Sequence, residues 1–340
     1  MFIKSTFAAA AIISAATLVA ADYDPSNLPA KTDPSHGQIG YNDCQSRYGA
    51  SNSKSLCQNV FVNSVKDFCL WAPRYSAAIG DQEADTVAYC MKSGYGTRLI
   101  PDGTIKGVQF IKTPSFVQVT GLCDCTKINV APRDEGGELD PHGATGAGNP
   151  VGGLVFTRAF SSTNAFQQIH EWNNFMAYNE FSFRACIGPN AKKYCPHIYD
   201  LQGSEWNEPG KYQAGVFEQC DGKEGNPPGI YTMGNTTSTF HQGQGPDPPA
   251  QAPGATSNCR EYASISTGPA AVTPTKGSTT VGSVSTSKST SKSTSKSTST
   301  VQKATIISSA SKTAAAKTVS QAKAASTAVR RHQLKRQSAH

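Results

Sequence analysis

One glycine-rich segment gathers the side chains best suited to hold a ligand. Residues 136–153 contain seven glycines, with Glu138, Asp140, His142 and Asn149 between them. Glycine lets a backbone approach a ligand closely and adopt positive φ, and carboxylate, amide and carbonyl oxygens are calcium ligands. The spacing matches no calcium loop. The segment could bind calcium or a glycan, or take part in catalysis, but a second interpretation is open. In that interpretation the segment is an irregular surface loop whose polar side chains bond to its own backbone.

A second candidate is the histidine–carboxylate pair His170 and Glu171. Such a pair can perform general acid–base catalysis. Adjacent residues do not face each other on a helix, however. We therefore expect Trp172 to pack in the core, with the charged pair in capping or surface roles.

A third candidate, residues 195–208, combines aromatic side chains with the carboxylates of Asp200, Glu205 and Glu208. Two carboxyl groups roughly 5–9.5 Å apart would suit a glycosidase, and Trp206 would suit a platform for sugar. The simpler interpretation is a loop tethered at one end by a disulfide. The sequence has no Gly-x-Ser-x-Gly, His-Glu-x-x-His, phosphate-loop or dinucleotide motif that would name a reaction.

The N-terminus predicts the compartment. Residues 1–21 join a positive start at Lys4, a short apolar run and a small-residue exit, which are the three parts of a secretory signal peptide. The apolar run is too short for a comfortable transmembrane span. We expect a secreted, extracellular or cell-wall protein that begins near Asp22 and does not span a membrane.

Ten cysteines follow the signal, and an even number in a secreted chain predicts five disulfides. They are Cys44, Cys57, Cys69, Cys90, Cys123, Cys125, Cys186, Cys195, Cys220 and Cys259. Cys69–Cys90 and Cys186–Cys195 are local candidate pairs, whereas Cys123 and Cys125 are expected to bond to different segments because one residue separates them. No Cys-x-x-Cys pair or zinc-type His/Cys spacing is present, so we expect no thiolate metal site and no cofactor other than calcium.

Charge divides the mature chain in two. Residues 22–262 carry 18 of the 31 basic residues and all 24 acidic ones, a net charge of −6, which disfavours nucleic-acid binding. Residues 263–340 carry twelve basic residues and no acidic one in a Ser/Thr/Ala/Lys polymer, which predicts a disordered, O-glycosylated tail. This tail either adheres to anionic polymers or serves as a soluble spacer. Asn235 begins an Asn-x-Thr sequon.

The positions of Val, Ile, Phe and Thr predict a mainly β, sandwich- or barrel-like domain over residues 41–262, after an extended leader over residues 22–40. Strands are predicted at 97–101, 104–111, 116–120, 127–130, 153–157, 181–184 and 215–217. One or two minor helices are predicted, and the best candidate is residues 164–176, where Phe166, Ile169 and Trp172 share a face. Residues 242–258 read as a stiff proline-rich connector that Cys259 pins to the domain.

Several blocks of the sequence resemble a family of secreted basidiomycete glycoproteins. They are residues 69–73, 89–105, 137–143, 148–156, 170–176, 183–186 and 194–200. The family is known as macrophage-activating glycoprotein and includes an immunoreactive mannoprotein of a pathogenic yeast. The resemblance implies a mannosylated protein that is associated with the cell wall or shed from it. It brings no enzyme activity and no catalytic residue.

Two functions from different classes therefore remain open. The first is a non-enzymatic extracellular glycoprotein that binds cell-wall polysaccharide or host surface molecules. The second is a secreted carbohydrate hydrolase that uses carboxylates of the 200–208 region. A cleft with two carboxyl groups roughly 5–9.5 Å apart would favour the hydrolase. A shallow aromatic platform without such a pair would favour binding.

Overall fold

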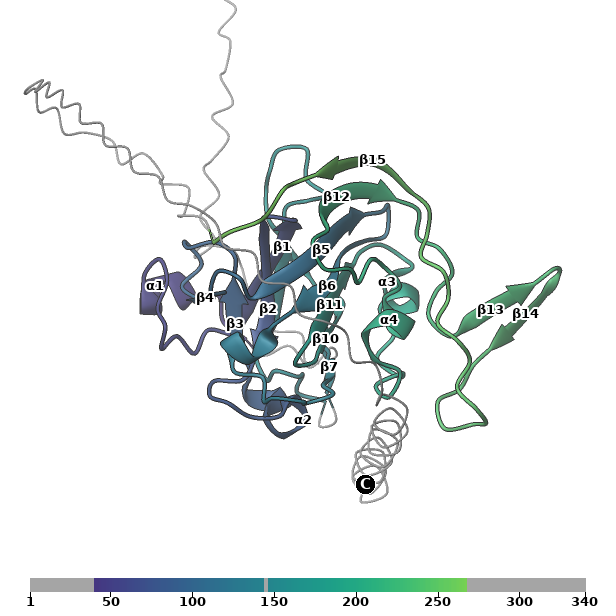
Figure 1. Ribbon diagram of the computed structural model, residues 1–340, viewed down its shortest axis with the longest axis horizontal. Helices are drawn as coiled ribbons and strands as arrows, with labels where there is room; N and C mark the ends of the chain where they lie inside the picture. The colour runs from purple at the N-terminus through teal and green to yellow at the C-terminus, as the bar shows by residue number, and fades with distance from the viewer. Residues whose placement is uncertain (1–39, 144–145, 268–340) are drawn as a thin grey trace, which may run out of the picture. The chain divides into compact units, whose positions relative to one another are not determined.

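The computed structural model describes residues 40–143 and 146–267, which form a mainly β fold (Figure 1). The predicted signal peptide, the predicted leader up to residue 39 and most of the predicted tail, from residue 268 on, lie outside these residues. The strands are β1 (Asn59–Ser64), β2 (Asp67–Ala72), β3 (Val87–Cys90), β4 (Arg98–Leu99), β5 (Ile105–Lys112), β6 (Phe116–Cys123), β7 (Gly137–Leu139), β8 (Leu154–Thr157), β9 (Gln167–Ile169), β10 (Glu171–Met176), β11 (Glu180–Cys186), β12 (Phe217–Gly222), β13 (Ile230–Met233), β14 (Thr236–Thr239) and β15 (Thr256–Glu261). The helices are short: α1 (Cys44–Tyr48), α2 (Ile79–Gln82), α3 (Ala191–Tyr194), α4 (Gly203–Asn207) and the 3₁₀ turns η3 (Glu83–Asp85) and η4 (Cys125–Ile128).

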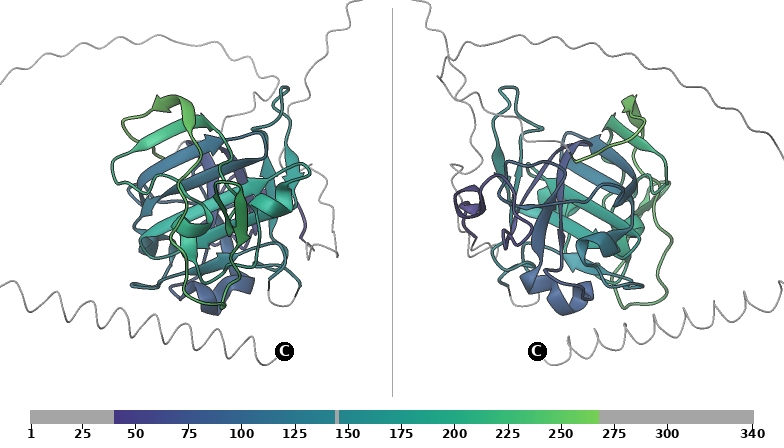
Figure 2. Two further views of the ribbon diagram at one scale, coloured as in Figure 1. Left: turned by 90° about the vertical axis from the view of Figure 1, so that its right-hand side faces the viewer. Right: turned by 60° about the vertical axis from the view of Figure 1, so that its left-hand side comes forward.

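Two large sheets form the domain. The six-stranded sheet has the order β4-β3-β2-β1-β8-β9, and the seven-stranded sheet has the order β15-β12-β5-β6-β11-β10-β7. The seven-stranded sheet is seen at an angle in Figure 2, with β15 at its edge. A separate ribbon of β13 and β14 projects from the sandwich (Figure 1). A turn at Asp102–Gly103 carries the chain from β4 in one sheet to β5 in the other.

The core lies between the two sheets and is centred on aromatic side chains. Trp71 of β2 lies against Trp172 of β10, with ring centroids 4.5 Å apart, and both are fully buried. Phe68 meets Phe181 in the same way, with centroids 6.0 Å apart. The Trp71 backbone N–H also donates to the Asn174 side chain at 3.1 Å, so a polar contact fixes how the sheets face each other.

The outer face of the seven-stranded sheet is also buried, but it is polar. Asn173 of β10, Arg184 of β11 and Gln118 of β6 stand in one row of the strand register, and each is at most 4 % exposed. The segment that contains α3 and α4 contacts β11 and β10 on this side (Figure 1). Because side chains alternate along a strand, β11 presents Phe181, Phe183 and Ala185 to the core and the polar Ser182 and Arg184 to this cover.

Five disulfides join all ten cysteines. Cys69–Cys90 and Cys186–Cys195 confirm the two predicted local pairs. Cys44–Cys57 and Cys220–Cys259 are two further bonds. The expectation for Cys123 and Cys125 was wrong, because they bond to each other. The chain bends between them as β6 gives way to η4, which brings their Cα atoms to 5.2 Å, inside the range a disulfide requires.

Two secondary-structure predictions were also wrong. Residues 164–176 form β9 and β10 in place of a helix, because β10 is buried on both faces and so lacks the alternation that marks a half-exposed strand. The predicted strand 127–130 begins within η4. The connector is confirmed as pinned, since Cys259 bonds to Cys220 and β15 pairs with β12.

Two further features concern membrane-spanning helices and the glycosylation sequon. No helix among residues 40–143 and 146–267 is long and apolar enough to cross a membrane. Asn235 lies in the exposed turn between β13 and β14.

Candidate functional site

The three segments that the sequence singled out meet at one end of the polar outer face. The glycine-rich segment continues from β7 and brings Asp140 and His142 there. Glu171 is the first residue of β10, and the segment after α3 brings His197 and Asp200. The site therefore comes from residues separated by up to about sixty positions in the sequence, which the sheet aligns.

A disulfide places the third segment over the second. Glu171 stands directly opposite Cys186 in the antiparallel pairing of β10 with β11. Cys186 bonds to Cys195, and His197 follows two residues later. The Cys186–Cys195 disulfide and Pro196 thus connect β11 to His197, which holds the imidazole close to Glu171.

Asn173 ties all three segments together. It lies two residues after Glu171 on the same face of β10. Its side-chain amide donates to a carboxylate oxygen of Glu138 in β7 and to the Pro196 carbonyl oxygen, the latter at 3.0 Å. The residue before His197 is therefore fixed to the sheet.

We call His142, Glu171 and His197 the histidine–glutamate cluster. One potential ligand atom from each residue lies within 4.8 Å of the other two. His142 Nε2 is 3.8 Å from Glu171 Oε2, and the His142 and His197 rings stack with centroids 3.8 Å apart. Glu171 is buried and the two histidines are half-buried. The Lys192 ammonium approaches Glu171 Oε1 to 3.8 Å from a largely exposed position.

Burial dominates the electrostatics beside this cluster. It raises the pKa of Glu138 well above the usual range, and the charges of Asp200 and Asp140 raise it further. Burial also raises the pKa of Asp140, although hydrogen bonds from the Gly143 and His142 backbone lower it again. Burial lowers the pKa of His197. The neutral imidazole that results is the form that can accept a proton or bind a metal.

Asp140 acts on its own loop, as the structural interpretation of the glycine-rich segment predicts. Its Oδ1 accepts the backbone N–H groups of His142 and Gly143 at 2.7 and 2.8 Å. The Asn149 side-chain amide nitrogen donates to Glu83 Oε2 at 3.0 Å. The calcium hypothesis needs Glu138, Asp140 and Asn149 to turn oxygens toward one point. Asp140 Oδ1 is taken by its own loop and a Glu138 oxygen by Asn173, and the calcium site stays a prediction.

The carboxyl groups of residues 200–208 have different surroundings. Asp200 interacts with Glu138 and Asp140, whereas Glu208 lies among Arg184, Ser182 and Tyr212. Glu205 is exposed on α4. The hydrolase hypothesis stays a prediction, with Asp200 beside the buried carboxyl groups of Glu138 and Asp140.

Trp206 is not an open platform for sugar. It is 7 % exposed, and its ring packs edge-on against Tyr199 and Phe240. Its indole N–H donates to the Pro248 carbonyl oxygen at 3.0 Å. Trp206 thereby anchors the proline-rich connector.

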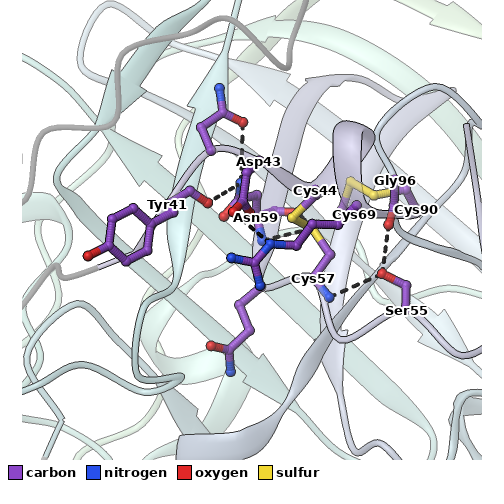
Figure 3. Close-up of a disulfide and its surroundings, with 12 residues drawn as sticks. Tyr41, Asp43, Cys44, Ser55, Cys57, Asn59, Cys69, Cys90 and Gly96 are labelled. Atoms are coloured by element: carbon purple, nitrogen blue, oxygen red, sulfur yellow. Dashed lines mark hydrogen bonds and ion pairs between the residues drawn. A yellow bond between two sulfur atoms is a disulfide. The ribbon is translucent and has the colours of Figure 1, made fainter. Parts of the chain in front are cut away.

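A separate surface pocket opens at the start of the described chain. Its volume is about 220 Å³, and its wall includes Tyr41, Leu56 and the ion pair of Arg47 with Asp43, 2.7 Å apart. Tyr41 is 72 % exposed. The Cys44–Cys57 disulfide also lines the pocket, and Figure 3 shows it with Tyr41 and Asp43. We call this the Tyr41 pocket. An exposed aromatic ring beside planar polar groups is a combination that suits a sugar ring.

Sequence reasoning missed parts of both sites. Glu171 was considered only as part of a His170–Glu171 pair, and His197 lay within the 195–208 segment without a role of its own. Three side chains from three separate segments carry no spacing signal. Sequence reasoning also placed the first residues of the Tyr41 pocket at the border between leader and domain. The available clue was that His142 precedes a glycine and His197 follows closely after a cysteine.

Comparison with known proteins identifies the family. The chain is 60 % identical over 280 residues to appressorium protein ROW2 of Mycosarcoma maydis, covering 81 % of this chain and 94 % of ROW2. It is 47 % identical over 232 residues to appressorium protein ROW1 of the same fungus, covering 68 % of this chain and about half, 53 %, of ROW1. No family model matches the chain, and no solved structure matches it. The fungal origin inferred from the resemblance agrees with these relatives, whose names say nothing of mannoproteins. The chain belongs to the family of fungal appressorium proteins that includes ROW2.

Proposed function

We propose that this protein works outside the fungal cell as a host-interaction protein of the appressorium, the cell with which a fungus attaches to and enters its host. The observation that carries the proposal is the 60 % identity to ROW2 across nearly all of that protein. Five disulfides support an extracellular setting, because such bonds persist in oxidising compartments. Glycan attachment at Asn235 and along residues 263–340 belongs to the same proposal.

The test is location and loss of function during infection. A fluorescent fusion inserted after the signal peptide should collect at the appressorium surface, and deletion of the gene should reduce the number of appressoria that enter host tissue. A fusion retained inside the cell, or a deletion strain that infects like wild type and lacks a redundant relative, would contradict the proposal.

We further propose that the Tyr41 pocket contacts a glycan of the fungal wall or the host surface. Its volume of about 220 Å³ lies below the usual range for drug-sized ligands, so it suits a single sugar unit at the end of a chain. The Arg47–Asp43 pair offers donors and acceptors to sugar hydroxyls beside the Tyr41 ring.

Binding can be measured by co-sedimentation with insoluble chitin, β-glucan and mannan. Tyr41→Ala should weaken binding by about tenfold, which corresponds to the loss of one aromatic stacking contact. Tyr75→Ala is the matched control, because Tyr75 is also exposed, at 57 %, but does not line the pocket. Equal binding by both variants would remove the pocket from the proposal while leaving the appressorial role standing.

A further inference from the structure

We propose that the histidine–glutamate cluster binds one divalent transition-metal ion, with Zn²⁺ as the foremost candidate. Two imidazoles and one carboxylate are a common set of protein ligands for zinc. The three side chains come from three separate segments that converge on the outer face of the seven-stranded sheet. This inference is independent of the role proposed for the Tyr41 pocket.

The distances between the three potential ligand atoms are only slightly longer than those of a zinc site. Zinc bonds of about 2.0–2.1 Å in tetrahedral geometry place neighbouring ligand atoms about 3.3 Å apart. His142 Nε2 and Glu171 Oε2 are 3.8 Å apart, and all three ligand atoms lie within 4.8 Å of one another. Rotation of the two stacked imidazoles about their side-chain bonds would direct their lone pairs toward a common point without backbone movement.

The backbone of each ligand is already fixed. Asp140 Oδ1 holds the His142 N–H at 2.7 Å, and the β10–β11 pairing holds Glu171. The Cys186–Cys195 disulfide and the contact of Asn173 with Pro196 hold His197. Such anchoring lowers the entropy that metal binding must remove.

His197 adds an independent observation. Its Nδ1 is buried and accepts or donates no hydrogen bond among the residues that the structure describes. A buried polar atom without a partner costs free energy. A metal bond to this nitrogen would relieve that cost, whereas a purely structural histidine would normally be hydrogen-bonded there.

The donor types select the metal class. Calcium takes six to eight oxygen ligands, whereas this cluster offers two nitrogens, which suit zinc and its neighbours in the first transition series. Three protein ligands leave a fourth position for water or for a donor atom from a partner. The other group of possible ligands, Glu218 with Cys220 and Cys259, offers no thiolate because both cysteines are in a disulfide.

Lys192 provides an internal check on charge. Its ammonium lies 3.8 Å from Glu171 Oε1 and is 72 % exposed. A bound cation would repel it, and its exposure allows it to move into solvent. Lys192→Ala should therefore tighten zinc binding severalfold, whereas a site elsewhere on the molecule would not respond.

The experiment uses the untagged secreted protein, because polyhistidine tags bind zinc. After treatment with chelator and its removal, titration calorimetry with ZnCl₂ should show one ion bound per chain. Thermal melting with ZnCl₂ should show a rise in Tm. His197→Ala and Glu171→Gln should each weaken binding by at least about 100-fold. His241→Ala, an exposed histidine outside the cluster, should bind as wild type does. Titration with CaCl₂ should leave the Tm unchanged.

Cobalt substitution keeps the proposal testable even where a variant folds poorly. Co²⁺ bound to the wild-type protein should give the visible absorption of a four-coordinate nitrogen–oxygen site, and Zn²⁺ should displace it at one equivalent. Absence of zinc binding by the folded wild-type protein would overturn the proposal. So would binding that survives in folded His197→Ala and Glu171→Gln, or a cobalt spectrum typical of an octahedral aquo ion.

Discussion

At the scale of single residues, Glu208 shows how a buried carboxyl group links folding to pH. Glu208 is 1 % exposed and lies among Arg184, Ser182 and Tyr212. Burial raises its pKa to about 8, although the charge of Arg184 lowers it in part. A buried carboxyl that is protonated in the folded state binds its proton more tightly there than in the unfolded chain.

Glu208 should therefore make the protein less stable as pH rises. Its contribution is most favourable below about pH 4.5, the pKa of an unfolded glutamate, and is lost progressively up to about pH 8. The slope is at most about 1.4 kcal/mol per pH unit. Glu208→Gln should flatten this dependence, which urea unfolding at pH 5, 6, 7 and 8 would measure. An unchanged slope would show that Glu208 ionises freely in the fold.

Asp67 is a second buried carboxyl group, with a hydroxyl and a guanidinium as close partners. It is 1 % exposed, receives the Tyr95 hydroxyl at 2.9 Å and pairs with Arg158 at 2.7 Å. Asp67→Ala leaves these partners without their acceptor and should lower the free energy of unfolding by about 3–5 kcal/mol. Asp67→Asn keeps the contact with Tyr95 and should cost less. Denaturant unfolding of both variants gives the comparison, and equal losses would mean that only the charge matters.

At the scale of elements, the Cys186–Cys195 disulfide decides where the cover segment lies. It closes a loop with a sequence separation of only 9 residues, so its contribution to stability should be modest, about 2–3 kcal/mol. Its effect on position should be larger, because it connects β11 to the residues that lead to His197.

The double variant Cys186→Ser/Cys195→Ser should keep the sandwich and loosen residues 195–200. Hydrogen exchange should become faster in that segment and stay slow in β10, whose bonds to β7 and β11 do not depend on it. The corresponding change at Cys123 and Cys125 is the control, since that bond spans only two positions. Faster exchange throughout β10 and β11 would show that the disulfide supports the whole sheet.

The elements also show what the sequence could predict. Val- and Phe-rich runs predicted β5, β6, β8 and β11, because hydrophobic runs between turns reflect the strand directly. The pattern at residues 164–176 was misleading, because β10 is buried on both faces. Trp172 and Met176 lie on one face of the strand and Asn173 on the other. A strand covered on both faces loses its period of two, and its apolar residues can fit a helical period by coincidence.

At the scale of the whole molecule, the disulfides should be complete. All ten cysteines are paired within the described residues, so a thiol assay on the secreted, denatured protein should detect no free thiol. Reduction should unfold the domain, because native bridges in secreted domains each contribute about 2–5 kcal/mol. Circular dichroism before and after reduction measures this. Two or more reactive thiols, or a reduced protein with an unchanged spectrum, would contradict the prediction.

The candidate site required the whole fold before it could be seen. The sequence marked Glu138, Asp140 and His142 as candidates, and the structure brings them beside Glu171 and His197. No spacing rule connects these groups, because the β7–β10–β11 register and one disulfide create their proximity. Composition predicts that such polar residues are present, and topology alone decides which of them meet.

The parallel pairing of β1 with β8 has a consequence for how the protein is made. Asn59 pairs with Leu154, some 95 positions later, while the other edge of β1 meets β2 almost at once. At a synthesis rate of about 5–20 residues per second, the β1 edge waits roughly 5–20 seconds for its partner. During that interval the apolar residues Val60, Phe61 and Val62 leave one strand edge unpaired. Production of this protein in quantity should therefore depend on the chaperones that cover such edges, more than on the stability of the finished sandwich.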